Sequence, residues 1–180
     1  MIGLFWKKAL IHTFTHKLIQ QDVKQETSLI AERRFSVNRQ SGETTPLYEQ
    51  LVMDEEYDYL FRRLFSEAQA QVLSAIPSRC VEETPTDLLP YLIEHREYDD
   101  NKDWLLVLKP AKNFPMQYRK ALDSEIEGML VDYICYRWLE TKSAQDAEGY
   151  FGRVEARKEE IRKILAKGYR AEGRWPSILP

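Results

Sequence analysis

His12 and His16 lie four residues apart, a spacing that places two imidazoles on one face of a helix, where they could share a metal ion. A zinc site needs further ligands, and none is patterned nearby. The intervening Thr-Phe-Thr run also lacks the acid of a zinc protease. We therefore interpret both as helix-surface histidines at the edge of the core, and His95 as a lone histidine on a strand.

Two acid-rich segments, 54–58 and 99–103, offer oxygen ligands that a hard cation could bind. The same residue types are typical of helix N-caps and turns, and we favour that interpretation. The chain has no Gly-rich phosphate loop, no Gly-x-Ser-x-Gly elbow, no Cys-x-x-Cys pair and no Glu-x-x-His pair of a di-iron bundle. The sequence therefore predicts no catalytic, cofactor-binding or metal-binding residue, and a protein that is not an enzyme.

Basic residues near the C-terminal end could form a phosphate-contacting stripe on a helix. Residues 153–174 include eight bases and four acids, whereas residues 82–103 include eight acids and two bases. Because the bases alternate with glutamates, we favour a solvated face over a nucleic-acid site. The net charge of −3 also supplies no global attraction to phosphate, so nucleic-acid binding is an alternative only.

Arginine and aromatic residues gather near the end of the third predicted helix, a composition typical of interface hot spots. A buried aromatic core has the same composition, so the sequence leaves Tyr136 and Arg137 open to either role. The irregular C-terminal stretch, about 168–180, carries apolar side chains that could dock on a neighbour or pack on their own bundle. The candidate interface residues are Arg137, Tyr136, Arg157, Arg162, Trp175, Ile178 and Leu179.

The 180 residues suit a single domain, 1–180, with one core. Seven Gly and eight Pro favour long helices over the many tight turns of a β-sandwich. Two cysteines do not indicate a disulfide framework. Lysines and histidines interrupt the first apolar runs, so we expect neither a signal peptide nor a membrane span, and a protein that stays in the cytoplasm.

Apolar periodicity predicts four helices. The first runs from residue 9 to about 34 and is followed by a loop at 36–46. The second begins at the N-cap Asp54 and ends near Ile76. The third begins near Pro115 and has the clearest core-facing stripe.

The fourth predicted helix begins at Ser143, which with Asp146 resembles a capping box, and ends before Gly168. The short break at 141–143 makes the third and fourth helices an antiparallel pair. Between helices two and three, at about 90–109, a turn between two β-like runs predicts a short hairpin. The predicted fold is α+β, mostly α: an antiparallel four-helix bundle with one short β-hairpin.

The second half of the chain has a recognisable order of elements. It runs through a strand WLLVLKP, a connector KNFPMQY, a helix DSEIEGMLVDYICYRWLE, a break KSAQDAEGYF, and a last helix VEARKEEIRKIL before a basic tail. This layout resembles that of prophage-encoded virion proteins of the neck or head-tail connector type. Upstream, MDEEYDYLFRRLFSEAQAQVL resembles the earlier helix of those proteins.

The resemblance implies a non-enzymatic structural protein of a tailed phage or prophage that self-associates and binds portal, tail or capsid proteins. It implies a location in the host cytoplasm during assembly and then in the virion, with no cofactor and no catalytic residues carried over. Two alternatives stay open. One is a nucleic-acid-binding helical regulator that uses the basic stripe, and the other is a small metal-binding helical enzyme built on His12 and His16.

Overall fold

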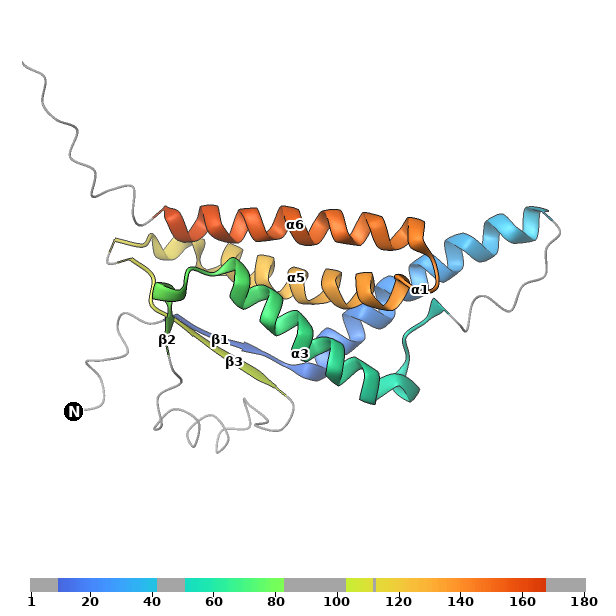
Figure 1. Cartoon of the computed structure of the whole chain (residues 1–180), viewed down its shortest axis with the longest axis horizontal. Coiled ribbons are helices and arrows are strands. Elements are labelled where there is room, and N and C mark those ends of the chain that lie inside the picture. The colour runs from blue at the N-terminus through green and yellow to red at the C-terminus, as the bar shows by residue number, and fades with distance from the viewer. Residues whose placement is uncertain (1–9, 42–50, 83–102, 112, 168–180) are drawn as a thin grey trace, which may run out of the picture.

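The computed structural model describes residues 10–41, 51–82, 103–111 and 113–167. These residues are mostly helical with one small antiparallel sheet, which confirms the mainly helical class (Figure 1). No helix in this part of the chain is both long and apolar enough to cross a membrane. The elements are β1 (Leu10–Phe14), α1 (His16–Ser41), η2 (Glu55–Tyr57), α3 (Asp58–Ala75), η3 (Ser78–Cys80), β2 (Val81–Glu82), β3 (Trp104–Leu108), η4 (Met116–Tyr118), α5 (Arg119–Leu139) and α6 (Ala144–Ala166).

The first element of the described residues is a strand, β1, where the sequence pattern predicted the start of a helix. Leu10 and Phe14 are buried and fit a helical spacing, but His12 between them is buried too, while Thr13 is exposed. Burial at every second residue is the period of a strand with one face on the core. The prediction was wrong because a spacing of four residues fits both periods.

β3 is the central strand of a sheet with the order β1-β3-β2. It pairs antiparallel with the whole of β1, so that Leu10 lies opposite Leu108 and Phe14 opposite Trp104. On its other edge β3 pairs with the two residues of β2. The predicted strand is confirmed, but its partner β1 was not predicted, and the first arm of the predicted hairpin lies outside the described residues.

α1 continues to Ser41, through the first half of the loop predicted at 36–46. The first glycine of this loop is Gly42, so no strong helix breaker precedes the observed end. At the other end, the backbone N–H of His16 donates to a carboxylate oxygen of Asp103 at 2.9 Å. Figure 1 shows the C-terminal part of α1 extending past the ends of the other helices.

The predicted N-cap at Asp54 is confirmed, although it caps the short helix η2 that leads into α3. Its carboxylate accepts a hydrogen bond from the backbone N–H of Glu56 at 3.1 Å, which satisfies one free donor at the helix start. α3 ends at Ala75, two residues before Pro77, where a proline cannot continue the helix. The second predicted helix is therefore confirmed at both ends.

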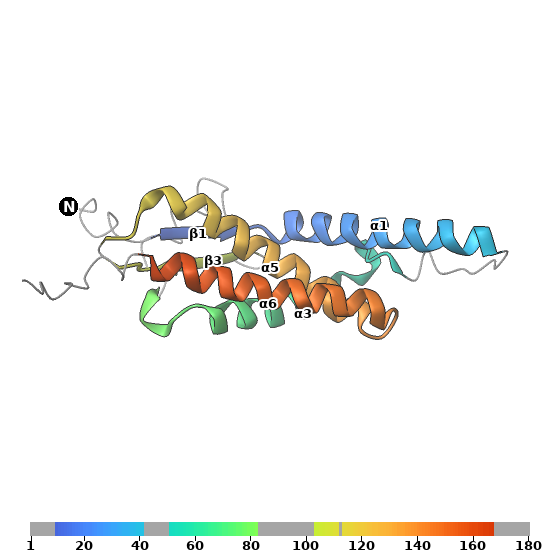
Figure 2. The same ribbon diagram turned by 90° about the horizontal axis from the view of Figure 1, so that it is seen from above.

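α5 is the central helix and packs against α6, α3, α1 and the sheet. Its buried stripe includes Leu122, Ile126, Leu130 and Ile134, as its periodicity predicts. α6 returns alongside α5 after a short connection, which confirms the predicted antiparallel pair (Figure 1). Figure 2 shows α1 on one side of α5 and α3 on the other.

Two buried side chains hold the segment that precedes α3 against the core. The Thr27 hydroxyl accepts a hydrogen bond from the backbone N–H of Met53 at 3.1 Å and donates to the Val23 carbonyl at 2.8 Å. The indole N–H of Trp138 donates to the Leu51 carbonyl at 2.6 Å. The structure therefore places Trp138 in the core, as the sequence analysis favoured.

Candidate functional site

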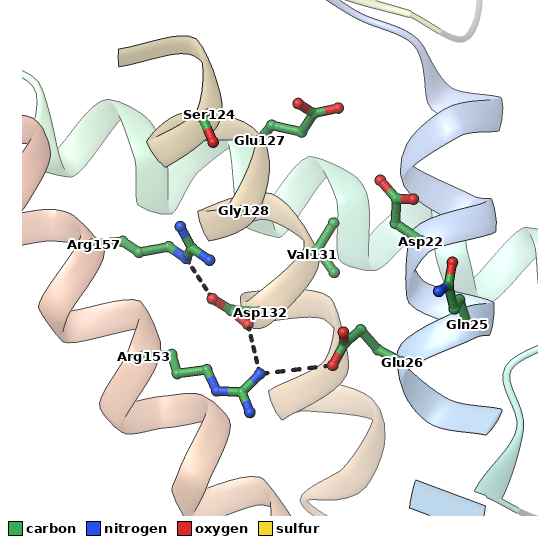
Figure 3. Close-up of a pocket in the computed structure, with 10 residues that line it drawn as sticks. All are labelled: Asp22, Gln25, Glu26, Ser124, Glu127, Gly128, Val131, Asp132, Arg153 and Arg157. Atoms are coloured by element: carbon green, nitrogen blue, oxygen red, sulfur yellow. Dashed lines mark hydrogen bonds and ion pairs between the residues drawn. The ribbon is translucent and has the colours of Figure 1, made fainter. Parts of the chain in front are cut away.

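A polar hollow lies where α1, α5 and α6 meet (Figure 3). It has a volume of about 390 Å³ and is open to solvent on one side. We call it the charged groove. Its lining residues are Asp22, Gln25 and Glu26 of α1, Ser124, Glu127, Gly128, Val131 and Asp132 of α5, and Arg153 and Arg157 of α6.

Asp132 is the centre of the charged groove. It lies in the middle of α5 and is only 4% exposed, so its charge must be compensated by nearby groups. Arg157 of α6 donates from Nε to Oδ2 of Asp132 at 2.6 Å, and Arg153 places Nη1 3.6 Å from Oδ1. Arg157 also donates from Nη1 to Glu125 at 3.1 Å. These contacts tie the middles of α5 and α6 together.

Gly128 makes room for the Arg157 side chain. A Cβ atom built at Gly128 would lie 2.3 Å from Cζ of Arg157 and at similar distances from both terminal guanidinium nitrogens. The glycine leaves room for the guanidinium beside α5, from where it reaches both Asp132 and Glu125. Glycine in the middle of a helix is unfavourable by itself, so its presence here has a packing reason.

Glu26 connects α1 to α6 at the edge of the groove. The Tyr150 hydroxyl donates to Oε2 of Glu26 at 2.7 Å, and Nη1 of Arg153 lies 3.7 Å from the same oxygen. Arg153 also stacks over the Tyr150 ring, 4.6 Å from its centroid. Burial, then Cys135 and the bond to Glu26, raise the pKa of Tyr150, so its hydroxyl stays protonated and acts as a donor.

The mouth of the groove carries excess negative charge. Burial, followed by the charges of Asp22 and Asp123, raises the pKa of Glu127. Among the described residues no basic side chain forms an ion pair with Asp22 or Glu127. Asp123 instead faces Nδ1 of His12.

The groups in the groove mainly neutralise one another, and nothing in the geometry activates a nucleophile. Cys135 lies nearby, but burial raises the pKa of its thiol well above the ordinary value, so it stays protonated. The two arginines that line the hollow are held by carboxylates. The described arrangement can fix three helices relative to one another, which is a structural role.

The histidine prediction was wrong in its placement. His12 lies on β1 and is 2% exposed, and His16 is the first residue of α1 and is also buried. The His16 ring contacts Phe61 edge-on, with centroids 4.7 Å apart. The two residues therefore do not share a helix face, and no group of three or more potential metal ligands gathers among the described residues. His95 lies outside the described residues.

The structure brings together two of the candidate interface residues. Tyr136 and Arg137 lie near the end of α5, and both reach Glu140, at 3.2 Å and 2.8 Å. The Tyr136 ring also lies 5.4 Å from that of Phe151, an aromatic side chain of α6 that is 48% exposed. The site that the sequence indicated here is a half-buried aromatic and charged surface between α5 and α6.

The other candidate interface residues are separated from this surface. Arg157 lies in the charged groove, and Arg162 lies on the exposed side of α6, where Nη1 is 2.7 Å from Glu159. Trp175, Ile178 and Leu179 lie outside the described residues.

Asp132 and Gly128 were not singled out by the sequence reasoning. The available signal was an acid and a glycine within the most apolar helical stripe of the chain, where each has an unfavourable position. Polar residues in such a stripe indicate a partner on a neighbouring helix. Which helix supplies the partner depends on how the helices pack.

The fold and this site define a mainly helical protein with a small antiparallel sheet and a charged junction of three helices. Comparison with protein-family models, curated proteins and solved structures finds no match in any of the three.

Proposed function

We propose that the chain is a non-enzymatic structural protein of a tailed phage or prophage, a head-tail connector or neck component that acts by self-association. The observation that carries the proposal is the order of elements from residue 104 onward. A strand, a short 3-10 turn, a long helix, a break and a second long helix follow one another in the structure. This is the layout on which the resemblance to connector proteins rests.

The charge distribution on α6 supports a structural role over the nucleic-acid alternative. Lys158 lies 2.7 Å from Glu155, Arg162 lies 2.7 Å from Glu159, and Lys163 lies 3.4 Å from Glu160. A base beside a carboxylate of its own helix releases few counterions on meeting phosphate, so it adds little affinity. The described part of the basic stripe therefore favours a solvated face.

We further propose that the four helices act as one antiparallel bundle. Chain directions alternate from α1 through α3 and α5 to α6, and α5 contacts each of the others (Figure 1). A hairpin between α3 and α5 stays a prediction. As a connector, the protein would bind copies of itself and portal, tail or capsid proteins, first in the host cytoplasm and then in the virion.

The sharpest test is genomic context combined with reconstitution. Genes for portal, major capsid and tail proteins should flank this gene, and the purified full chain should co-elute with the portal protein encoded beside it. A gene set for metabolism, together with no association with any neighbouring virion protein, would refute the proposal. A duplex-DNA shift that weakens steeply with salt and is lost in Arg162→Gln/Lys163→Gln would instead favour the nucleic-acid alternative.

A further inference from the structure

A small hollow lies at the end of the α5–α6 hairpin, near the point where the chain turns from one helix into the other (Figure 1). It has a volume of about 250 Å³ and is open to solvent. We call it the aromatic hollow. Its lining residues are Tyr136 and Glu140 at the end of α5, and Ala144, Ala147, Glu148 and Phe151 of α6.

Two aromatic rings line the aromatic hollow. The rings of Tyr136 and Phe151 have centroids 5.4 Å apart and planes inclined by 50°, so they form an open corner rather than a closed stack. The Tyr136 hydroxyl donates to Oε1 of Glu140 at 3.2 Å, which restricts the Tyr136 ring. Phe151 is 48% exposed. An aromatic face that is open to solvent presents its negative electron density to a cation.

Glu148 supplies the free charge of the aromatic hollow. α6 is described along its whole length, and each of its three other glutamates lies between 2.7 and 3.4 Å from a base three residues further on. Three and four residues from Glu148 in either direction, the helix carries only alanine, glutamine, phenylalanine and glycine, so α6 offers it no such partner. The second carboxylate, Glu140, is bound by Arg137 at 2.8 Å. The net charge of the lining is therefore negative.

We propose that the aromatic hollow binds an arginine side chain of a partner protein. The guanidinium stacks on the Phe151 ring and donates to the Glu148 carboxylate, while its apolar stem covers Ala144 and Ala147. A planar guanidinium makes both contacts at once, because it stacks through its face and donates from its edge. An apolar group would cover the Glu148 charge without neutralising it, and an acidic group would face two carboxylates, so neither fits.

The chain holds one of its own arginines by the same two kinds of contact. Arg153 stacks over the Tyr150 ring, 4.6 Å from its centroid, and its Nη1 lies 3.7 Å from Oε2 of Glu26. The aromatic hollow offers a ring and a carboxylate as well, but its lining residues include no base. A contact that stabilises the fold beside the charged groove is thus open to a partner at the end of the hairpin.

The test is a titration of the nitrogen-15-labelled full chain with N-acetyl-arginine-N-methylamide, observed through the backbone amide signals. The signals of Ala147, Glu148 and Phe151 should shift saturably, with a dissociation constant on the order of 10 mM, because one stacked and ion-paired side chain is a small ligand. The corresponding citrulline compound has nearly the same shape without the charge and should give no saturable shift. Saturation by both compounds, or by neither, overturns the proposal. A lysine compound that binds as tightly overturns the choice of arginine.

Two variants test which groups form the site. Glu148→Gln removes the carboxylate and Phe151→Ala removes the ring, and each should raise the dissociation constant by at least about threefold. Both are surface changes, and circular dichroism checks the fold of each variant. The matched control is Glu159→Gln, which neutralises an exposed glutamate of α6 outside the hollow and should leave the affinity unchanged. If Glu159→Gln weakens binding as much as Glu148→Gln does, the compound responds to the overall charge of α6 and the assigned site is wrong. The portal experiment, and not this titration, decides the connector proposal.

Discussion

Replacing Gly128 by alanine tests the packing of the charged groove directly. In a solvent-exposed helix interior, Gly→Ala stabilises a protein by about 1 kcal/mol, because glycine has the greater backbone freedom to lose. At Gly128 the new Cβ would lie 2.3 Å from Cζ of Arg157, so the guanidinium must move away from α5. Its movement breaks the bonds to Asp132 and Glu125.

The loss of these bonds should exceed the gain in helix propensity. Removing one partner of a buried ion pair costs about 3–5 kcal/mol when the other charge is left alone. Arg157 is partly exposed and Arg153 remains near Asp132, so a smaller loss of about 2 kcal/mol is expected. Gly128→Ala should therefore lower the free energy of unfolding by about 1 kcal/mol.

A double-mutant cycle with Arg157→Ala gives the sharper test. Without the guanidinium, the three atoms nearest to the Cβ at residue 128 are gone and Asp132 has already lost its main partner. Gly128→Ala should then stabilise the chain by about 1 kcal/mol, so the sign of its effect reverses between the two backgrounds. Urea unfolding of the four proteins measures the coupling, which should be about 2 kcal/mol.

Gly152→Ala on α6 is the matched control, because nothing lies within 4 Å of a Cβ built there. It should raise the free energy of unfolding by about 0.5–1 kcal/mol in both backgrounds. If Gly128→Ala stabilises the chain equally with and without Arg157, the guanidinium does not lie over Gly128, and the account of the groove fails.

Two further predictions follow from the buried groups. Glu127→Gln should raise the free energy of unfolding slightly at neutral pH and leave it unchanged at acidic pH in urea titrations. The reason is that burial, Asp22 and Asp123 raise the pKa of Glu127, and a raised carboxyl pKa lowers stability as the pH rises through it. A thiol reagent should label neither Cys80 nor Cys135 in the folded chain, because both are buried, and should label both in urea. Labelling of Cys135 in the native protein would contradict the burial that raises the pKa of its thiol.

The helices were predictable because their signals are local. The Asp54 cap, Pro77 and the apolar stripe of α5 each act within a few residues, and the structure places the helices accordingly. The end of α1 was missed because Ser, Asn and Gln between residues 36 and 41 resemble a loop in composition, while none of them prevents a helix.

The sheet and the site depend on contacts between distant segments. β1 becomes a strand because β3, far along the chain, pairs with it from Leu10↔Leu108 to Phe14↔Trp104. Its five residues carry too few apolar side chains to separate a period of two from a period of 3.6. Asp132 is similar, because its place in an apolar stripe signals a partner but does not identify Arg157.

The contacts of the predicted helix cap at Ser143 also depend on a distant segment of the chain. The residue precedes α6 as predicted, but its hydroxyl does not bond to the helix backbone. Instead it pairs with the Asp146 carboxylate, and Arg34 of α1 contacts both side chains, at 2.8 Å from the hydroxyl and 2.9 Å from the carboxylate. The two residues predicted to cap α6 therefore form a contact between α1 and the start of α6.

The charged groove fixes the rotation of α1 about its own axis. Apolar side chains such as Val23 hold α1 against α5, but apolar contacts alone tolerate some rotation about the helix axis. The polar contacts of Glu26 do not tolerate such a rotation. A step of one residue turns the helix by about 100° and would remove the Glu26 carboxylate from Tyr150 and Arg153. By fixing Glu26, the groove also fixes the direction in which Leu18 and Leu29 face. The polar junction therefore contributes specificity of orientation.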